Sequence, residues 1–252
     1  MTGQFQPATL KTFGASPFFI FCDHASNDIP APFDALGLPQ EILKTHIAWD
    51  IGAAALSTTL AERLNGAAFL CTSSRLLIDV NRSPDANDAI PSQSDQTPIP
   101  GNVNLSANHR ADRFAIYHEA YHAMLEGALT SLQERISVQP FVVSVHSFTK
   151  RMSGAAADRP WPISLLSRHD RPSTVRAIDL LSAATGWPIG DNEPYSAHEF
   201  NYTIDRNVAP RGFKHLTFEI RQDMIGDDAG VSDIADILTP VIAEVAAVKA
   251  TV

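Results

Sequence analysis

The architecture of this chain follows from Phe18-Phe19-Ile20-Phe21-Cys22, five apolar residues that run directly into Asp23-His24-Ala25-Ser26-Asn27. A short apolar run of this kind predicts a buried strand. A second run, Phe141 to Val145, is followed by His146-Ser147. Ligand sites in open α/β sheets form beyond the carboxyl ends of strands, and imidazole is a good zinc ligand. His24 and His146 are therefore candidate metal ligands; the alternative is that each caps a loop by hydrogen bonding.

Short apolar runs alternate with helical patterns along the chain, which indicates an α/β layer architecture. Further strands are predicted at 67–72, 76–80, 163–166, 202–204 and 215–221. Helices are predicted at 50–65, 111–136, 173–185 and 232–249, and irregular connections at 82–108, 147–162 and 188–201. Long irregular loops are usually functional, so the proline-rich stretch 82–108 is a candidate lid. No linker divides the chain, so residues 1–252 are expected to form a single domain.

Composition and charge argue against several classes of protein. The chain has 28 acidic and 19 basic residues and a net charge of −9, so a nucleic-acid-binding protein is not expected. It has neither an apolar stretch long enough to span a membrane nor a recognisable secretory signal at its N-terminus. Cys22 and Cys71 lie in apolar runs, which indicates buried thiols in a reducing compartment. A cytoplasmic protein without nucleic-acid or membrane partners is expected.

The predicted strand 215–221 contains a glutamate, Glu219, among apolar residues. A carboxylate is costly to bury unless it is paired or has a function. Glu219 is therefore a candidate general base near a metal-activated water. The alternative is a surface ion pair with Arg221, because residues two apart in a strand point the same way.

Arginines gather near two of these strand ends. Arg75 precedes Asp79-Val80-Asn81-Arg82, and Arg151 follows His146 at a short distance. Guanidinium groups bind carboxylates through two parallel hydrogen bonds, so these residues could hold an anionic substrate. The alternative is that Asp79 anchors a loop and the arginines are solvated.

A competing motif lies in the predicted helix 111–136. The segment His118-Glu119-Ala120-Tyr121-His122 fits the pattern H-E-x-x-H, which on a helix places two zinc-binding histidines on one face. A third ligand should follow, but Glu126 and Glu134 are too close in sequence. The alternative is an amphipathic helix whose polar residues face water.

Six short blocks together identify a family. They are D-H-A-S-N from residue 23, A-W-D-I-G-A from 48, R-L-L-I-D-V-N-R from 75, V-H-S-F-T from 145, D-N-E-P-Y-S from 191 and F-E-I-R-Q-D from 218. The chain resembles the N-formylglutamate amidohydrolase family from about residue 18 to residue 225. Members are similar to zinc carboxypeptidases and aspartoacylase-type deacylases. The resemblance implies a single-domain α/β fold with a mixed sheet flanked by helices, of the zinc-carboxypeptidase or phosphorylase/hydrolase-like type.

The resemblance also implies roles for individual residues. His24 and His146 correspond to the two zinc histidines, and Glu219 to the general base. Asn81 and Arg82 correspond to an Asn-Arg pair that binds the substrate carboxylate or steadies the carbonyl oxygen. His118 and His122 have no zinc role in this pattern.

The chain departs from the carboxypeptidase pattern H-x-x-E, because Asn27 stands where the acid is expected. A neutral amide is a poor zinc ligand. We expect Asp50 of the W-D block as the third ligand, with Asp23 and Asp28 as rivals. The alternative for Asp50 is an N-cap of the helix that begins at Ile51.

The implied enzyme is an amidohydrolase with one Zn²⁺ per chain. Its expected substrate is a small N-formyl or N-acyl amino acid, with N-formylglutamate giving formate and glutamate in histidine breakdown. Glu219 and Arg82 are the expected catalytic residues. The expected substrate-binding residues are Arg75, Asn81, Arg151, Asn192, Tyr195 and Arg221. Two alternatives remain open: a carboxypeptidase-like peptidase, and a non-catalytic metal- or ligand-binding protein, which the missing acid at Asn27 motivates.

Overall fold

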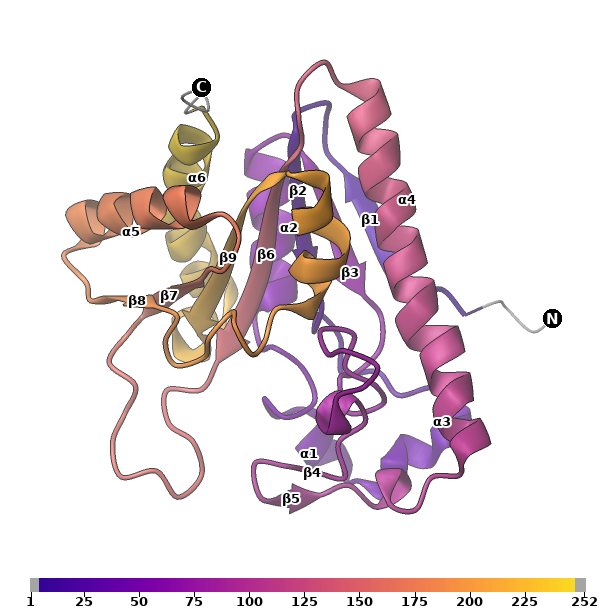
Figure 1. The fold of residues 1–252 in the computed structure, drawn as a ribbon. Coiled ribbons are helices and arrows are strands. Elements are labelled where there is room, and N and C mark those ends of the chain that lie inside the picture. The colour runs from indigo at the N-terminus through magenta and orange to yellow at the C-terminus, as the bar shows by residue number, and fades with distance from the viewer. Residues whose placement is uncertain (1–4, 248–252) are drawn as a thin grey trace.

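The structure is a computed structural model that describes residues 5–247. Within this part, seven strands form the main sheet in the order β1-β3-β2-β6-β9-β7-β8 (Figure 1). The strands are β1 Ala8–Thr12, β2 Phe18–Cys22, β3 Ala67–Cys71, β6 Phe141–Phe148, β7 Ile163–Leu166, β8 Ile189–Asp191 and β9 Lys214–Arg221. A separate two-stranded hairpin pairs β4 Gln93–Ser94 with β5 Thr97–Pro98.

The centre of the main sheet is parallel and its margins are mixed. Strands β3, β2, β6 and β9 run in the same direction. Strand β1 is antiparallel to β3, and β7 is antiparallel to β9 but parallel to β8. The carboxyl ends of the four central strands therefore meet at one edge. This arrangement confirms the predicted mixed α/β sheet flanked by helices.

The helices of the described chain cover both faces of the sheet. They are α1 Gln40–Leu43, α2 Ala53–Arg63, α3 Ala107–Arg113, α4 Ala120–Arg135, α5 Arg171–Thr185 and α6 Asp228–Ala247, with π-helical segments at Phe114–Glu119 and Ile204–Val208. Figure 1 shows α4 on one side of the sheet and α5 and α6 on the other. Helix α2 packs against α6, so it belongs to the same layer as α6.

Alternate residues of a strand point to opposite faces of a sheet. Ile20 and Val143 therefore lie in the core beneath α2, α5 and α6. Their neighbours Phe19 and Val142 lie in the core beneath α4. Because both faces are covered, β2 and β3 are apolar at every position and β6 begins with an apolar run, and this is why these strands could be recognised in the sequence.

The predicted strands at 67–72, 141–145, 163–166 and 215–221 are confirmed, as are the helices at 111–136 and 173–185. The predicted helix 50–65 is shorter, since α2 begins at Ala53. The helix predicted at 232–249 begins earlier, at Asp228, and its last two predicted residues lie outside the described part. Two edge strands, β1 and β8, were not predicted, and β8 falls in a stretch expected to be a loop.

Two predicted strands are wrong. Residues 76–80 form a turn, and Leu76, Leu77 and Ile78 are buried in a third apolar cluster together with loop residues. Residues 202–204 lead into the π-helix Ile204–Val208. Short apolar runs are buried equally well in turns and in strands, so apolarity alone could not separate the two.

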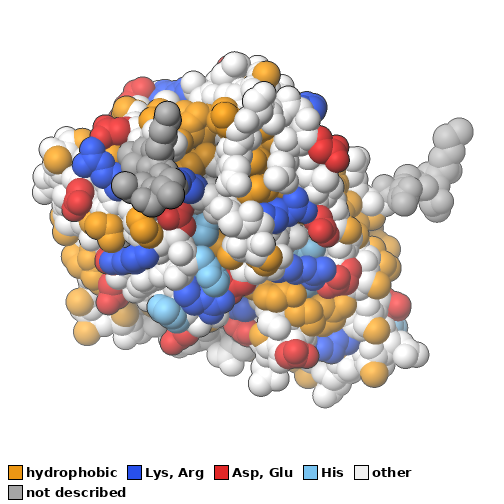
Figure 2. Space-filling view, turned by 45° about the horizontal axis from the view of Figure 1, so that its top comes forward, with side chains coloured by type: hydrophobic (Ala, Val, Ile, Leu, Met, Phe, Trp, Pro, Cys, Tyr) orange, Lys and Arg blue, Asp and Glu red, His pale blue; other side chains and the backbone are white. Residues whose placement is uncertain are grey.

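No helix among the described residues is long and apolar enough to cross a membrane. Figure 2 shows basic and acidic side chains interspersed over one face of the described molecule, without a continuous basic surface there.

Candidate active site

The candidate site lies at the carboxyl edge of the central strands. His24 follows β2 by two residues, while His146 and Glu219 lie near the ends of β6 and β9. His146 and Glu219 are direct partners in the parallel register of β6 and β9. Asp50, from the segment before α2, joins them because its backbone N–H donates to the His24 carbonyl at 2.9 Å. Four segments that are distant in sequence thus meet at one point.

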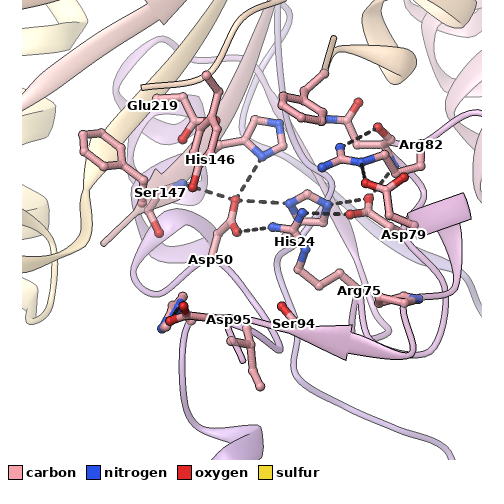
Figure 3. A pocket seen from close by; sticks show the side chains of 18 of the residues that line it. His24, Asp50, Arg75, Asp79, Arg82, Ser94, Asp95, His146, Ser147 and Glu219 are labelled. Carbon is pink, nitrogen blue, oxygen red and sulfur yellow. Dashed lines mark hydrogen bonds and ion pairs between the residues drawn. The ribbon is translucent and has the colours of Figure 1, made fainter. Parts of the chain in front are cut away.

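Three of these side chains could hold a metal ion. Asp50 Oδ2 lies 3.3 Å from His24 Nδ1 and 2.9 Å from His146 Nδ1. One ligand atom from each of the three residues lies within 4.8 Å of the others, and all three residues are buried. Figure 3 shows Asp50 between the two imidazoles. Two imidazoles and a carboxylate are a typical protein ligand set of a catalytic zinc, which leaves one position for water.

A carboxylate stands behind each imidazole. Asp79 Oδ1 lies 2.8 Å from His24 Nε2, and Asp23 Oδ2 lies 3.5 Å from His146 Nε2. Metal-binding histidines usually direct their second ring nitrogen to such an acceptor, which leaves the first nitrogen for the metal. Both Nδ1 atoms face Asp50, so the donor set fits a divalent cation such as Zn²⁺.

Asp23 is fixed by two further hydrogen bonds. The Tyr121 hydroxyl donates to Asp23 Oδ1 at 2.7 Å and the Thr203 hydroxyl donates to the same oxygen at 2.9 Å. Asp23, considered as a rival ligand, therefore lies behind His146 rather than within the ligand set, and Asp28 is not part of the cluster. The Asn27 amide donates to the Leu43 carbonyl at 2.8 Å, so the residue that stands at the acidic position of the carboxypeptidase pattern anchors a loop here.

The N-cap alternative for Asp50 is wrong. The N-cap of α2 is Gly52, and no side chain caps this helix. Gly52 has a φ of 80°, and a Cβ there would lie 2.1 Å from the Ile225 carbonyl oxygen. Only glycine suits this backbone conformation and this close contact. The turn at Gly52 connects Asp50 to α2.

Opposite charges hold these acids ionised. Burial alone would raise the pKa of Asp50, but His24 and His146 keep it well below its ordinary value. Burial would likewise raise the pKa of Asp79, but His24 and Arg75 hold it well below its ordinary value. Both carboxylates are therefore negative at neutral pH and complement a cation.

Glu219 has a different environment. It lines the same cavity, its side chain is buried, and its Oε2 has no hydrogen-bond partner among the described residues. Burial raises the pKa of Glu219 to about 7, and Asp50 adds to that rise, while His146 opposes it. Arg221 pairs with Asp223 at 2.7 Å rather than with Glu219. The surface-pair alternative is therefore wrong, and Glu219 is suited to exchange a proton near neutral pH.

Four of the predicted substrate-handling residues line the cavity: Arg75, Asn81, Arg82 and Tyr195. Arg75 donates to Asp79 Oδ2 at 2.8 Å and to Asp50 Oδ1 at 3.3 Å. Arg82 donates to Asp88 Oδ2 at 2.9 Å. Both guanidinium groups already have carboxylate partners on the protein.

The other three predicted residues lie elsewhere. Arg151 is exposed and pairs with Asp158 at 2.6 Å, and Arg221 pairs with Asp223. The Asn192 side chain accepts from the Ser167 and Ala197 backbone N–H groups at 3.0 Å each. None of the three is among the residues that line the cavity. A position near His146, near Glu219 or within the D-N-E-P-Y-S block was therefore not enough to predict which side chains line the cavity.

The H-E-x-x-H histidines do not join the metal cluster. His118 Nε2 lies 2.9 Å from the Arg82 carbonyl oxygen, and His122 Nε2 lies 2.9 Å from the Val80 carbonyl oxygen. Both side chains are buried, so the alternative of a solvated face is wrong as well. The two histidines of the motif instead contact the backbone carbonyl groups of Val80 and Arg82, the neighbours of Asn81.

The predicted lid segment contributes to the cavity wall. Asp88, Gln93, Ser94 and Asp95 come from residues 82–108, and His46 faces them, with its Nε2 3.0 Å from Asp95 Oδ2. None of these residues was predicted from the sequence, because isolated polar residues in a loop have no spacing that indicates a site. The cavity has a volume of about 250 Å³, which suits a small molecule.

The model of the N-formylglutamate amidohydrolase family matches residues 16–226. The chain belongs to the N-formylglutamate amidohydrolase family. All residues that line the cavity fall within the matched range. Family membership supports the predicted class of enzyme, an amidohydrolase.

Two solved structures are similar to this family member over almost their whole length. Gene product Atu2144 from Agrobacterium tumefaciens is 26% identical with a TM-score of 0.89, covering 98% of this chain and 97% of its own. An N-formylglutamate amidohydrolase from Ralstonia eutropha JMP134 is 21% identical with a TM-score of 0.68, covering 95% and 97%. The second likeness shows a shared fold. No curated protein sequence matches the chain significantly.

Proposed function

We propose that this chain is a metal-dependent amidohydrolase that cleaves N-formylglutamate, or a closely related N-acyl amino acid, to the free acid and the amino acid. Family membership and the fold shared with the Ralstonia enzyme support the reaction class. The observation that carries the proposal is the buried cluster of His24, Asp50 and His146, which opens on the same cavity as Glu219.

His24, Asp50 and His146 would hold one divalent ion, and Zn²⁺ suits two nitrogen donors and one oxygen donor. A zinc ion bound there would polarise the amide carbonyl and lower the pKa of a water molecule. Asp79 orients the His24 imidazole for this task through a hydrogen bond to Nε2, and the Asp23 carboxylate lies 3.5 Å from Nε2 of His146.

Glu219 is the proposed general base and acid. Its unpaired buried Oε2 accepts a proton from the attacking water, whose oxygen forms the new bond to the formyl carbon. Glu219 then delivers that proton to the amide nitrogen as the C–N bond breaks, so the products are formate and the free amine of glutamate. A pKa of about 7 allows the same carboxyl group to perform both transfers near neutral pH.

Arg75, Arg82 and Asn81 supply the groups that favour an anionic substrate. A protein of net charge −9 repels a dianion unless the local potential is positive. Arg75 and Arg82 line the cavity beside the metal ligands and can stabilise negative charge on the carbonyl oxygen or on a substrate carboxylate. Two buried, unpaired thiols, Cys22 and Cys71, accord with a cytoplasmic enzyme. Release of glutamate and formate would suit histidine breakdown.

Metal analysis combined with an assay of formate release tests this function. Wild type should contain about one zinc per chain and release formate from N-formylglutamate. Glu219→Gln should keep the zinc and lose roughly 10²- to 10⁴-fold in kcat. His24→Ala and His146→Ala should lose both zinc and activity.

Other outcomes are equally clear. Activity that is unchanged in Glu219→Gln contradicts the base assignment. Zinc retained in both histidine variants contradicts the metal site. Zinc without turnover of any N-acyl amino acid would indicate a binding protein.

A further inference from the structure

Arg159 does not itself line the cavity, but its guanidinium contacts two residues that do. Its Nη1 donates to the Thr149 carbonyl at 3.1 Å and to the Thr149 hydroxyl at 3.3 Å. Its Nη2 donates to the Tyr195 hydroxyl at 3.3 Å. Both Thr149 and Tyr195 line the cavity. The guanidinium therefore lies between two cavity hydroxyls.

The guanidinium of Arg159 is held in place by aromatic rings and by the backbone. Its Cζ lies 5.1 Å from the centre of the Tyr195 ring and 5.6 Å from that of Phe148. Its backbone N–H donates to the Lys150 carbonyl at 2.8 Å, which closes the loop that carries it. Stacking on aromatic rings and fixed hydrogen bonds reduce the entropy that the side chain would lose on binding a ligand.

The charge of Arg159 is uncompensated, unlike that of the other arginines at the site. Arg75 pairs with Asp79, and Arg82 pairs with Asp88. Arg159 forms no ion pair with any carboxylate in the described part of the chain. Asp95, the acid in the same region, is already engaged by His46 at 3.0 Å and by the Ser153 hydroxyl at 2.9 Å. A half-buried, stacked guanidinium without a counter-ion is suited to binding an anion.

We propose that Arg159, together with the hydroxyls of Tyr195 and Thr149, forms the subsite that binds one carboxylate of the substrate. The proposal rests on the proposed hydrolase function and names the residues that recognise the second carboxylate of its substrate. N-formylglutamate carries two carboxylates: one can lie near Arg75 and Arg82 beside the metal ligands, and the second needs another cation. The subsite thus selects N-acyl amino acids with an acidic side chain over those with a neutral one.

The test compares N-formylglutamate with N-formylglutamine, which has nearly the same shape and lacks the side-chain charge. Arg159→Gln should raise the KM for N-formylglutamate about 10- to 100-fold, the usual effect of losing a charge-assisted hydrogen bond. It should change the KM for N-formylglutamine less than about threefold, and zinc content should remain that of wild type. Arg159→Lys, which keeps the charge, should restore part of the lost affinity.

Arg151→Gln is the matched control, because Arg151 lies in the same loop but is exposed and pairs with Asp158. It should leave the KM for both substrates unchanged. The subsite proposal is overturned if Arg159→Gln affects both substrates equally, or if Arg151→Gln has the effect instead.

A separate binding experiment distinguishes failure of the subsite from failure of the proposed function. If wild type hydrolyses neither compound, the proposed function fails, and calorimetry with glutarate tests the subsite directly. Glutarate should then bind wild type at least tenfold more tightly than it binds Arg159→Gln. Equal binding to the two proteins would overturn the subsite as well.

Discussion

At the scale of single residues, the site is organised by pairs in which a carboxylate fixes an imidazole. Asp79 Oδ1 lies 2.8 Å from Nε2 of His24, and the other ring nitrogen of His24, Nδ1, therefore faces Asp50. A hydrogen bond from Nε2–H to Asp79 places the imidazole proton on Nε2. Nδ1 then has a free lone pair with which it can bind a cation. Asp79 was considered in the sequence only as a loop anchor, and its contact with His24 gives it a larger role.

Replacing Asp79 tests that role. Asp79→Asn should raise the dissociation constant for Zn²⁺ about 10- to 100-fold, because the imidazole loses the acceptor that orients it. Competition with a chromophoric zinc chelator measures the constant. Asp88→Asn is a suitable control, since Asp88 also lines the cavity and pairs with an arginine but contacts neither histidine. Equal weakening in the two variants, or none in Asp79→Asn, would mean that Asp79 does not orient His24.

At the scale of elements, the helix from α3 through α4 stabilises the segment that carries Asn81 and Arg82. The π-helix Phe114–Glu119 lies directly before α4, and π-helical turns are frequent at functional sites. His118 and His122, whose rings are 4.7 Å apart, lie near the carbonyl oxygens of Arg82 and Val80. The helix therefore fixes one wall of the cavity through its backbone.

A substitution at His118 separates this role from a metalloprotease role. His118→Ala should retain about one zinc per chain, because the metal ligands lie in other segments. It should lower kcat/KM several-fold, since the Arg82 backbone loses its partner at 2.9 Å. Elemental analysis and formate release measure the two quantities. Loss of the zinc in this variant would indicate that the H-E-x-x-H histidines bind the metal.

The sequence predicts correctly those elements whose residue pattern is compatible with only one kind of secondary structure. Strands β2, β6 and β9 are buried on both faces, so their apolar runs indicated strands, and the polar residues at or just beyond their carboxyl ends marked the site. The apolar residues Leu76, Leu77 and Ile78 are also buried, but in a turn that packs with loop residues, and only tertiary packing distinguishes the two cases. For the same reason Arg151 was chosen by its distance in sequence from His146, whereas Arg159, in the same loop, contacts Tyr195 of the cavity wall.

At the scale of the whole molecule, the candidate metal site links segments that are far apart in the chain. Asp50 contacts His24 across 26 residues and His146 across 96. An unfolded chain does not hold these groups together, because closing such long loops costs conformational entropy. A cation bound by all three residues therefore has a much higher affinity for the folded chain than for the unfolded one, and its binding adds to the stability of the fold.

This linkage predicts that Zn²⁺ raises the thermal midpoint of the metal-free protein. At a free concentration of 100 times the dissociation constant, a ligand specific for the folded state adds about 2.7 kcal/mol. For a chain of this size that amounts to a shift of about 5–10 °C, measurable by circular dichroism. Mg²⁺ should give little shift, since it prefers a full set of oxygen ligands. His24→Ala and His146→Ala should remove most of the shift produced by Zn²⁺. A shift as large in these variants as in wild type would place the stabilising ion elsewhere, because each variant removes one of the donors that the folded chain brings together.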